Sequence, residues 1–256
     1  MINFSIIVPM YNVAPFIERC IRSLENQDIL REDYEIICIN DGSPDNVQEI
    51  VEKLQLEFSN IILINQENQG VSMARNNGIA IAKGKYILPI DPDDFVLSNS
   101  FGYIKRKIES SDFDIAYLGF EFFNVEEHSV WKTDYNSKVD IDYSGLDGYF
   151  EARGAQIKDP DRSWAILYKN SLLEKFQIKY PKNVPYLEDG LFLAKVFSVA
   201  EKVIFFKEYF YQRTTRIGSA TNSNLFYTDQ SINGFMNAID DVKEFAIKNN
   251  LKGKQL

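Results

Sequence analysis

The sequence contains few side chains that bind transition metals or form disulfides, with two cysteines and one histidine in 256 residues. Two thiols cannot build a disulfide framework, and no Cys-x-x-Cys pair or Cys/His cluster is present. We therefore expect Cys20 and Cys38, which lie in predicted core segments, to be reduced and buried, as in a cytosolic protein. His128 stands in a polar stretch without a second ligand nearby, so we expect it at the surface and do not expect a zinc site.

Positive charge is also scarce, because 28 lysines and arginines stand against 37 aspartates and glutamates and leave a net charge of −9. No basic stripe is visible, which argues against a nucleic-acid partner. No apolar run approaches the roughly 18–20 residues of a membrane span, and the first residues lack the features of a signal peptide. The phosphate-binding loops GxGxxG and GxxxxGK[ST] are missing too. If the protein binds a phosphate ligand, a local feature of the binding site must offset the repulsion from the negative net charge of the protein.

What the sequence does contain is a globular composition, with 45% hydrophobic and 14% aromatic residues. Over the first 120 residues, short apolar runs alternate with amphipathic segments of helical period. This alternation predicts an α/β fold with a mostly parallel, doubly wound sheet. Strands are predicted at residues 4–8, 34–39, 61–64, 86–90 and 114–122, and helices at 14–26, 44–58, 71–82 and 98–108.

The second half of the chain is less regular, and we expect it to form a smaller part of the same domain. Residues 126–144 are typical of a loop or an edge hairpin. Further strands are predicted at 164–168, 203–206 and 209–213, the last two as a hairpin, and helices at 171–176, 189–199 and 226–249. The chain stops soon after the last of these, and truncation at the C-terminus is left open.

Polar residues follow three of the predicted parallel strands. The first strand is followed by Tyr11 and Asn12, the second by Asp41, and the fourth by Asp91 and Asp93. In open α/β sheets ligands bind beyond the carboxyl ends of the strands, so these groups are expected to face one crevice. Each segment taken alone is equally typical of a turn or a helix cap. A divalent cation on Asp91 or Asp93 would neutralise a diphosphate. Such a cation is the local feature that the negative net charge of the protein requires.

Taken in order, these segments resemble family 2 glycosyltransferases, which have the GT-A fold. The resemblance covers roughly residues 3–220, and each motif is weak alone. The motifs are Ser5-Ile6-Ile7-Val8-Pro9-Met10-Tyr11-Asn12, Asn40-Asp41-Gly42-Ser43, Asn68-Gln69-Gly70 with Ala74-Arg75-Asn76-Asn77-Gly78, the DxD-type run Asp91-Pro92-Asp93-Asp94, Trp164-Ala165-Ile166-Leu167-Tyr168 and the pair Glu188-Asp189. The chain departs from the pattern at Ala14, where some members carry an acid, and at Pro44, where threonine is common; neither departure removes a catalytic part.

The resemblance implies an inverting hexosyl- or N-acetylhexosaminyltransferase that uses a nucleotide sugar, most often a UDP-sugar, and a saccharide or lipid-linked saccharide acceptor. Residues 1–120 would form the donor half and residues 121–256 the acceptor-side half. The implied donor-binding residues are Pro9, Tyr11, Asn12, Asp41, Asn68, Gly70, Arg75, Asp91 and Asp93. Among them Asp41 would bond the base, Arg75 the nucleotide and Asp91 the ribose. Asp93, with Asp91 beside it, would hold Mg²⁺ or Mn²⁺ on the diphosphate.

By the same pattern Asp189 would be the general base, with Glu188 as its neighbour. Inverting transfer needs a base on one face of the sugar and a charge-stabilising group on the other, which these positions would supply. Without the family pattern, the pair is typical of the start of a helix. Trp164 is the aromatic residue best placed to stack on an acceptor sugar, with core packing as its alternative. Arg213 and Arg216 are candidates to reach the leaving diphosphate.

Two other functions are weighed against this one. A phosphatase or phosphotransferase would use the DxD run as nucleophile and acid, although that chemistry usually places its carboxylates after the first strand. A non-catalytic module that binds sugar nucleotides or glycans is disfavoured by the set Asp41, Asp93 and Asp189. Family analogy suggests bacterial surface-polysaccharide assembly and a cytoplasmic location, with peripheral association at the inner membrane and the oligomeric state left open.

Overall fold

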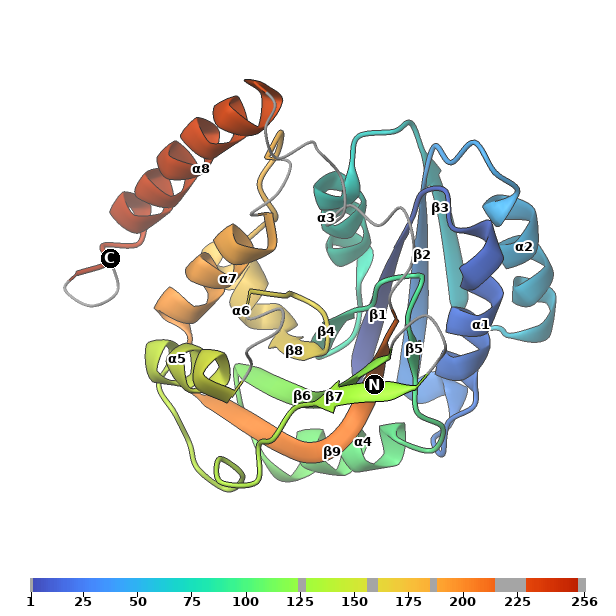
Figure 1. Cartoon of the computed structure of the whole chain (residues 1–256), viewed down its shortest axis with the longest axis horizontal. Helices are drawn as coiled ribbons and strands as arrows, with labels where there is room; N and C mark the ends of the chain where they lie inside the picture. The colour runs from blue at the N-terminus through green and yellow to red at the C-terminus, as the bar shows by residue number, and fades with distance from the viewer. Residues whose placement is uncertain (1, 124–127, 156–160, 185–187, 215–228, 253–256) are drawn as a thin grey trace.

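The computed structural model describes residues 2–123, 128–155, 161–184, 188–214 and 229–252, and it is built around one mixed sheet (Figure 1). The strands are β1 (Phe4–Met10), β2 (Tyr34–Asp41), β3 (Ile61–Gln66), β4 (Tyr86–Pro89), β5 (Phe95–Val96), β6 (Ile115–Phe123), β7 (Ser129–Lys132), β8 (Ile166–Lys169) and β9 (Val203–Arg213). The helices are α1 (Ala14–Glu25), η1 (Arg31–Asp33), α2 (Val47–Glu57), α3 (Val71–Ile81), α4 (Phe101–Ser110), α5 (Gly145–Ala155), α6 (Asn170–Phe176), α7 (Glu188–Val199) and α8 (Asp229–Lys248).

The first four strands form a parallel unit in the order β3-β2-β1-β4. Every residue of β1 is buried, and its side chains alternate between two cores. Ile6 and Val8 pack in the core shared with α1, α2 and α4, whereas Ile7 packs in the core shared with α3, α6 and α7. Helices therefore cover both faces of the sheet, which explains the continuous apolar runs of its strands. The predicted doubly wound α/β organisation is confirmed.

The second half of the chain extends this sheet with strands of both directions. β8 is antiparallel to β4 and β6, while β9 is parallel to β6 and antiparallel to β5. β9 is one continuous strand, so the predicted hairpin across residues 203–213 is wrong. The apolar pattern is interrupted there because the β6–β9 register shifts beside Gly119, where an added Cβ would lie 2.7 Å from the carbonyl oxygen of Glu208. An irregularity of the ladder, and not a turn, separates the two apolar segments.

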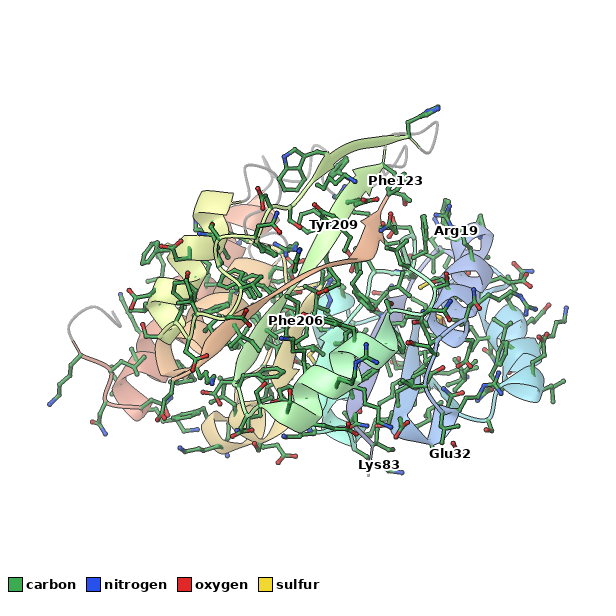
Figure 2. All side chains as sticks on the ribbon, turned by 90° about the horizontal axis from the view of Figure 1, so that it is seen from below. Arg19, Glu32, Lys83, Phe123, Phe206 and Tyr209 are labelled. Atoms are coloured by element: carbon green, nitrogen blue, oxygen red, sulfur yellow. The ribbon has the colours of Figure 1, made fainter. Side chains whose placement is uncertain are left out.

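The burial of individual side chains agrees with the remaining sequence-based expectations for the scaffold. Cys20 and Cys38 are free and buried, and His128 is exposed. Viewed from below, Phe206 lies among the side chains between β9 and α4, whereas Lys83 lies at the surface (Figure 2). None of the helices in the described part of the chain has the length and apolar character needed to cross a bilayer.

Candidate active site

The carboxylate of Asp41, at the end of β2, holds the turn that precedes α3. Its Oδ1 accepts hydrogen bonds from the backbone N–H of Gln69 (2.8 Å) and the side-chain amide of Gln66 (2.7 Å). Its Oδ2 accepts the backbone N–H of Gly70 (2.8 Å). The side chain is buried, so these donors compensate for its loss of water. Because Oδ2 accepts only one of these bonds, a lone pair remains for a donor group on a ligand.

Two glycines allow the β2 and β3 turns to approach each other. Gly42 and Gly70 both have a left-handed backbone, with φ of 64° and 85°. A Cβ at Gly42 would lie 2.8 Å from the backbone nitrogen of Asn68. A larger residue at position 42 would therefore push the exposed Asn68 away from this edge of the sheet.

The turn after β1 adjoins the turn after β2. Pro9 is buried within β1, whereas Tyr11 and Asn12 are exposed beyond its end. Asn12 has a left-handed backbone, with φ of 54°, and its N–H donates to Ser43 Oγ at 2.7 Å. The ends of β1 and β2 thus present predicted donor-binding residues side by side.

Arg75, on α3, joins two carboxylates that are far apart in the sequence. Its guanidinium donates to Asp91 Oδ1 at 3.0 Å and to Asp189 Oδ1 at 2.8 Å. The guanidinium carbon lies 5.2 Å from the centre of the Tyr180 ring. Asn76 holds Tyr180 in turn, because its side-chain amide exchanges two hydrogen bonds with the Tyr180 backbone, at 2.9 and 2.8 Å. The structure therefore brings Arg75, Asp91 and Asp189 together at the junction of the two halves.

Asp189 and Glu188 begin α7 and have different surroundings. Asp189 Oδ1 also accepts the Ser163 hydroxyl at 2.7 Å, and Oδ2 accepts the Ser163 N–H at 3.2 Å. Burial, together with the charge of Asp189, raises the pKa of Glu188 to about 7, against the opposing effect of Arg75. The side chain of Asp189 is 22% exposed, so it is held by protein donors and is still accessible to a ligand.

The three acids after β4 also differ from one another. Asp91 and Asp93 are half-buried. Burial raises the pKa of Asp91 to about 6, against the opposing effect of Arg75. Asp94 is buried and accepts hydrogen bonds from the hydroxyl of Tyr211 (2.6 Å) and the N–H of Thr214 (2.7 Å). Burial also raises the pKa of Asp94 well above the usual range. Asp91 and Asp93 are therefore partly exposed to solvent, whereas Asp94 is bound within the protein.

The donor set at this turn fits a hard divalent cation that is shared with a phosphate ligand. In the described part of the chain, no group of three or more histidine, cysteine or acidic side chains could form a metal site by itself. Mg²⁺ typically takes one or two protein carboxylates together with substrate phosphates and water. Asp91 and Asp93 supply oxygens of this kind, while one oxygen of Asp91 is already bonded to Arg75.

The environment of Trp164 is that of a core residue. The indole is 4% exposed, stacks on Tyr211 with centroids 4.6 Å apart, and meets the edge of Phe120 at 4.9 Å. Stacking on a sugar requires an open ring face, so the acceptor role of Trp164 stays a prediction. Arg213 is half-buried with its guanidinium carbon 5.8 Å from the Trp164 ring, and Arg216 lies outside the described residues.

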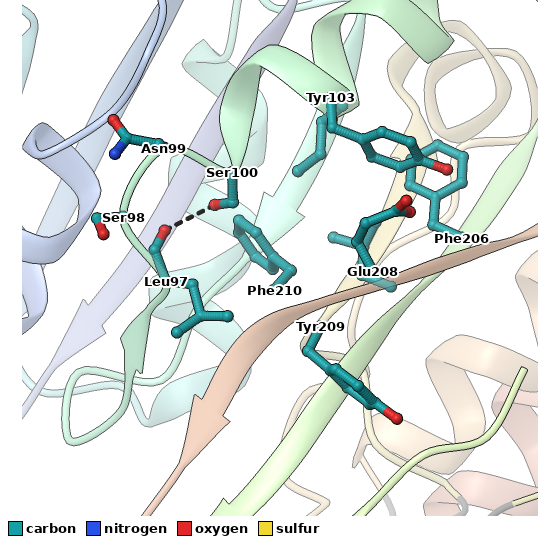
Figure 3. A pocket seen from close by; sticks show the side chains of 11 residues that line it. Leu97, Ser98, Asn99, Ser100, Tyr103, Phe206, Glu208, Tyr209 and Phe210 are labelled. Carbon is teal, nitrogen blue, oxygen red and sulfur yellow. Dashed lines mark hydrogen bonds between the residues drawn. The ribbon is translucent and has the colours of Figure 1, made fainter.

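A separate pocket of about 190 Å³ lies between α4 and β9 (Figure 3). None of the residues predicted for donor binding or catalysis lines it. Its lining residues are Leu97, Ser98, Asn99, Ser100, Tyr103, Ile104, Leu118, Phe206, Glu208, Tyr209 and Phe210. We therefore do not include it in the candidate active site.

Several residues that support the site were missed by sequence reasoning. Ser163 and Tyr180 contact the Asp189 and Arg75 region, and Tyr211 and Thr214 contact the Asp91–Asp94 turn. These four lie outside the motifs assigned a role in the site. Asp94 lies inside the DxD-type run, but nothing in the run distinguishes a buried acid from an accessible one.

Comparison with known proteins bears on the fold and on the family. The solved structure of Staphylococcus aureus TarS 1–349 in complex with UDP-GlcNAc has a TM-score of 0.74 and 20% identity, covering 96% of this chain and 73% of that one. EpsJ of Bacillus subtilis, described as an uncharacterized glycosyltransferase, is 34% identical over 205 residues, which are 78% of this chain and 57% of EpsJ. The poly(ribitol-phosphate) beta-glucosyltransferase of Bacillus spizizenii is 30% identical over 214 residues, which are 82% of this chain and 32% of that enzyme.

This chain thus spans only part of the length of these curated relatives. The structural likeness confirms the expected GT-A fold. The model of the family described as Glycosyl transferase family 2 matches residues 5–175, from β1 to α6. The matched region contains Asp41, Arg75, Asp91 and Asp93, while Asp189 follows it. The chain belongs to glycosyl transferase family 2.

Proposed function

We propose that this chain transfers a hexosyl or N-acetylhexosaminyl group from a UDP-sugar to a hydroxyl of a saccharide or lipid-linked saccharide, with inversion at the anomeric carbon. Residues 1–120 bind the donor, and residues 121–256 form the acceptor side. The UDP-sugar is supported by the UDP-GlcNAc bound in the TarS structure. A hydroxyl-bearing acceptor is supported by the name of one relative, which acts on poly(ribitol-phosphate), while the saccharide itself is taken from the family resemblance.

The observation that carries this proposal is the pair of salt bridges made by Arg75. They place Asp91, which follows β4, and Asp189, which begins α7, on the same guanidinium group. One carboxylate lies on the side where a diphosphate is expected, and the other on the side where a base is needed. A single displacement requires both groups within one small site.

In the proposed step, Asp189 takes the proton of the acceptor hydroxyl as the hydroxyl oxygen bonds to the anomeric carbon. The bond from that carbon to the diphosphate oxygen breaks, and UDP leaves with the electron pair. Oδ1 of Asp189 already accepts two hydrogen bonds, whereas Oδ2 accepts one longer bond. Oδ2 is therefore the atom that we assign to proton transfer.

Asp41, the end of β1 and the turn around Asn68 and Gly70 are assigned to the nucleotide. Asp91 and Asp93 would hold Mg²⁺ or Mn²⁺, which when bound neutralises charge on the diphosphate leaving group. We retain Arg75 as a residue close to the nucleotide, although in this structure its guanidinium is bonded to two acids. The prediction of a cytoplasmic protein in bacterial surface-polysaccharide assembly, with peripheral contact to the inner membrane, rests on analogy with the family.

The decisive experiment is a panel of nucleotide sugars tested with and without Mn²⁺. We expect at least one UDP-sugar to raise the unfolding temperature in the presence of Mn²⁺, and UDP to be released when an acceptor is added. Binding of no nucleotide sugar with Mn²⁺ present would contradict the proposal. Release of orthophosphate from simple phosphate esters would support the phosphotransferase instead.

The role of Asp189 is tested by Asp189→Asn, with Asp147→Asn as the matched control. Asp147 lies in the first turn of α5, accepts the Ser144 hydroxyl at 2.6 Å and is not among the residues proposed for donor binding or catalysis. We expect Asp189→Asn to keep donor binding and to lose about 10²- to 10⁴-fold in transfer rate. The control should change neither quantity. Loss of donor binding together with unfolding would assign Asp189 to helix capping.

A further inference from the structure

The third acid of the Asp91–Asp94 turn, Asp94, differs from the first two in its surroundings. Asp94 is 3% exposed, and protein donors occupy both of its oxygens. Oδ2 accepts the Tyr211 hydroxyl at 2.6 Å, and Oδ1 accepts the N–H of Thr214 at 2.7 Å. The Asp94 carboxylate therefore connects the turn to the end of β9 through these hydrogen bonds.

The same two β9-side residues also hold the backbone of the turn. The Tyr211 hydroxyl accepts a hydrogen bond from the backbone N–H of Asp91 at 3.2 Å. The same hydroxyl donates to the carboxylate of Asp94, so it joins the two ends of the turn. The Thr214 hydroxyl donates to the carbonyl oxygen of Asp93 at 2.8 Å. Contacts at Asp91, Asp93 and Asp94 therefore meet at two side chains more than 115 residues away in the sequence.

The position of Tyr211 is itself well defined. It lies in β9, opposite Phe120 of β6 and Val96 of β5. Trp164 stacks on its ring with an interplanar angle of 18°. The 91–94 turn runs directly into β5, which pairs with β9, so the turn is held at its end as well as along its length.

We propose that Tyr211, Asp94 and Thr214 are positioning residues that hold the turn so that Asp91 and Asp93 face the cation and the diphosphate. This inference rests on the proposed function. The three residues touch no reacting atom and act through the backbone of the turn, as partners of metal-ligating residues commonly do.

The test compares Tyr211→Phe with Tyr86→Phe in the full chain. Tyr86 is the control, because its buried hydroxyl likewise donates one hydrogen bond, to the backbone carbonyl of Phe113 (2.9 Å) in place of a carboxylate, and accepts one backbone N–H (3.4 Å). It begins β4, at the opposite end of the strand from Asp91. The two substitutions therefore remove similar hydrogen bonds and differ in their distance from the turn.

Two quantities are measured: the affinity for UDP in the presence of Mn²⁺, and hydrogen exchange of the backbone amides of Asp91, Asp93 and Asp94 in the ligand-free protein. We expect Tyr211→Phe to weaken Mn²⁺-dependent UDP binding by about tenfold and to speed exchange in the turn. We expect Tyr86→Phe to change neither. Thr214→Val, which removes the hydroxyl that reaches Asp93, should reproduce both effects and replaces Tyr211→Phe if that variant does not fold.

The outcomes separate this inference from the function on which it rests. A wild-type chain that binds no UDP with Mn²⁺ overturns the proposed function and the role of these residues with it. A wild-type chain that binds UDP, while Tyr211→Phe and Thr214→Val match Tyr86→Phe in both measurements, overturns the positioning role alone.

Discussion

At the scale of single residues, the neighbours Glu188 and Asp189 differ in their surroundings. Asp189 accepts hydrogen bonds from Arg75 and Ser163, whereas Glu188 has a pKa raised to about 7, mainly by burial. A carboxyl group with a raised pKa in the folded state binds more protons than it does in the unfolded chain. Its contribution to stability is therefore highest at low pH and falls as the pH rises from about 4.5 to about 7.

We predict that Glu188→Gln stabilises the protein at pH 8, by on the order of 1–2 kcal/mol, and has little effect near pH 4. The amide removes the charge that the partly buried site disfavours. Denaturant unfolding at several pH values measures the difference. Glu174→Gln, on the exposed side of α6, is the control and should show no comparable trend. A stability difference between Glu188→Gln and wild type that does not depend on pH would contradict the raised pKa.

A second residue-scale lesson concerns Trp164. The sequence makes Trp164 the best single candidate for an acceptor groove but favours core packing for any one aromatic residue, because an aromatic residue has the same identity in both places. The structure packs its face against Tyr211. Whether the ring is open or covered depends on β9, whose position relative to Trp164 no local pattern specifies.

At the scale of elements, α3 carries three consecutive polar residues with three different targets. Arg75 bonds Asp91 and Asp189, Asn76 bonds the backbone of Tyr180, and Asn77 donates to Gln66 at 2.7 Å. Successive residues of a helix point about 100° apart, which separates the three directions. The helix can lie close to the sheet at Gly78 because glycine has no side chain. A Cβ at this position would be 2.7 Å from the Ile7 side chain.

We predict that Gly78→Ala destabilises the protein by about 1–3 kcal/mol, because the added methyl displaces Ile7 or α3. Gly154→Ala in α5 is the matched control, since nothing lies within 4 Å of its added Cβ. The control should be neutral or stabilising by up to about 1 kcal/mol, because alanine favours a helix over glycine. The measurement is the free energy of unfolding of both variants relative to the wild type. Equal effects at both glycines would refute a close approach of α3 to β1.

At the scale of the whole molecule, Arg75 is a buried charged link between the two halves of the chain. Its partners Asp91 and Asp189 belong to different halves, and the guanidinium is almost fully buried. A buried cation of this kind compensates two acids, so its removal leaves both acids without a counter-charge.

We predict that Arg75→Met costs about 3–5 kcal/mol of unfolding free energy and abolishes donor binding. Arg22→Met is the control, because Arg22 also bonds an acid, Glu57 at 2.9 Å, but on the exposed surface. It should have a far smaller effect on stability. Denaturant unfolding and nucleotide binding are the measurements. A similar loss for both variants would mean that the Arg75 bridges contribute no more than surface ion pairs.

The sequence by itself determined the features that depend on near neighbours. Apolar period and turn residues predicted β1, β2 and β3 and the helices between them, and the motif order predicted the family. The sequence pattern does not predict a helix at residues 145–155, because three glycines obscure the helical period of α5. The two-residue β5 is likewise too short to leave a pattern.

Only the tertiary structure decided which polar residues meet. Arg75 and Asp189 are 114 positions apart, and Tyr211 and Asp94 are 117 apart. Their contacts depend on how β8 and β9 join the parallel strands, and periodicity carries no information about that pairing. For the same reason the run after β4 presents three identical acids in the sequence, while packing against β9 buries Asp94 and leaves Asp91 and Asp93 half-buried. The sequence placed acids at the strand ends, and the long-range packing assigned them different environments.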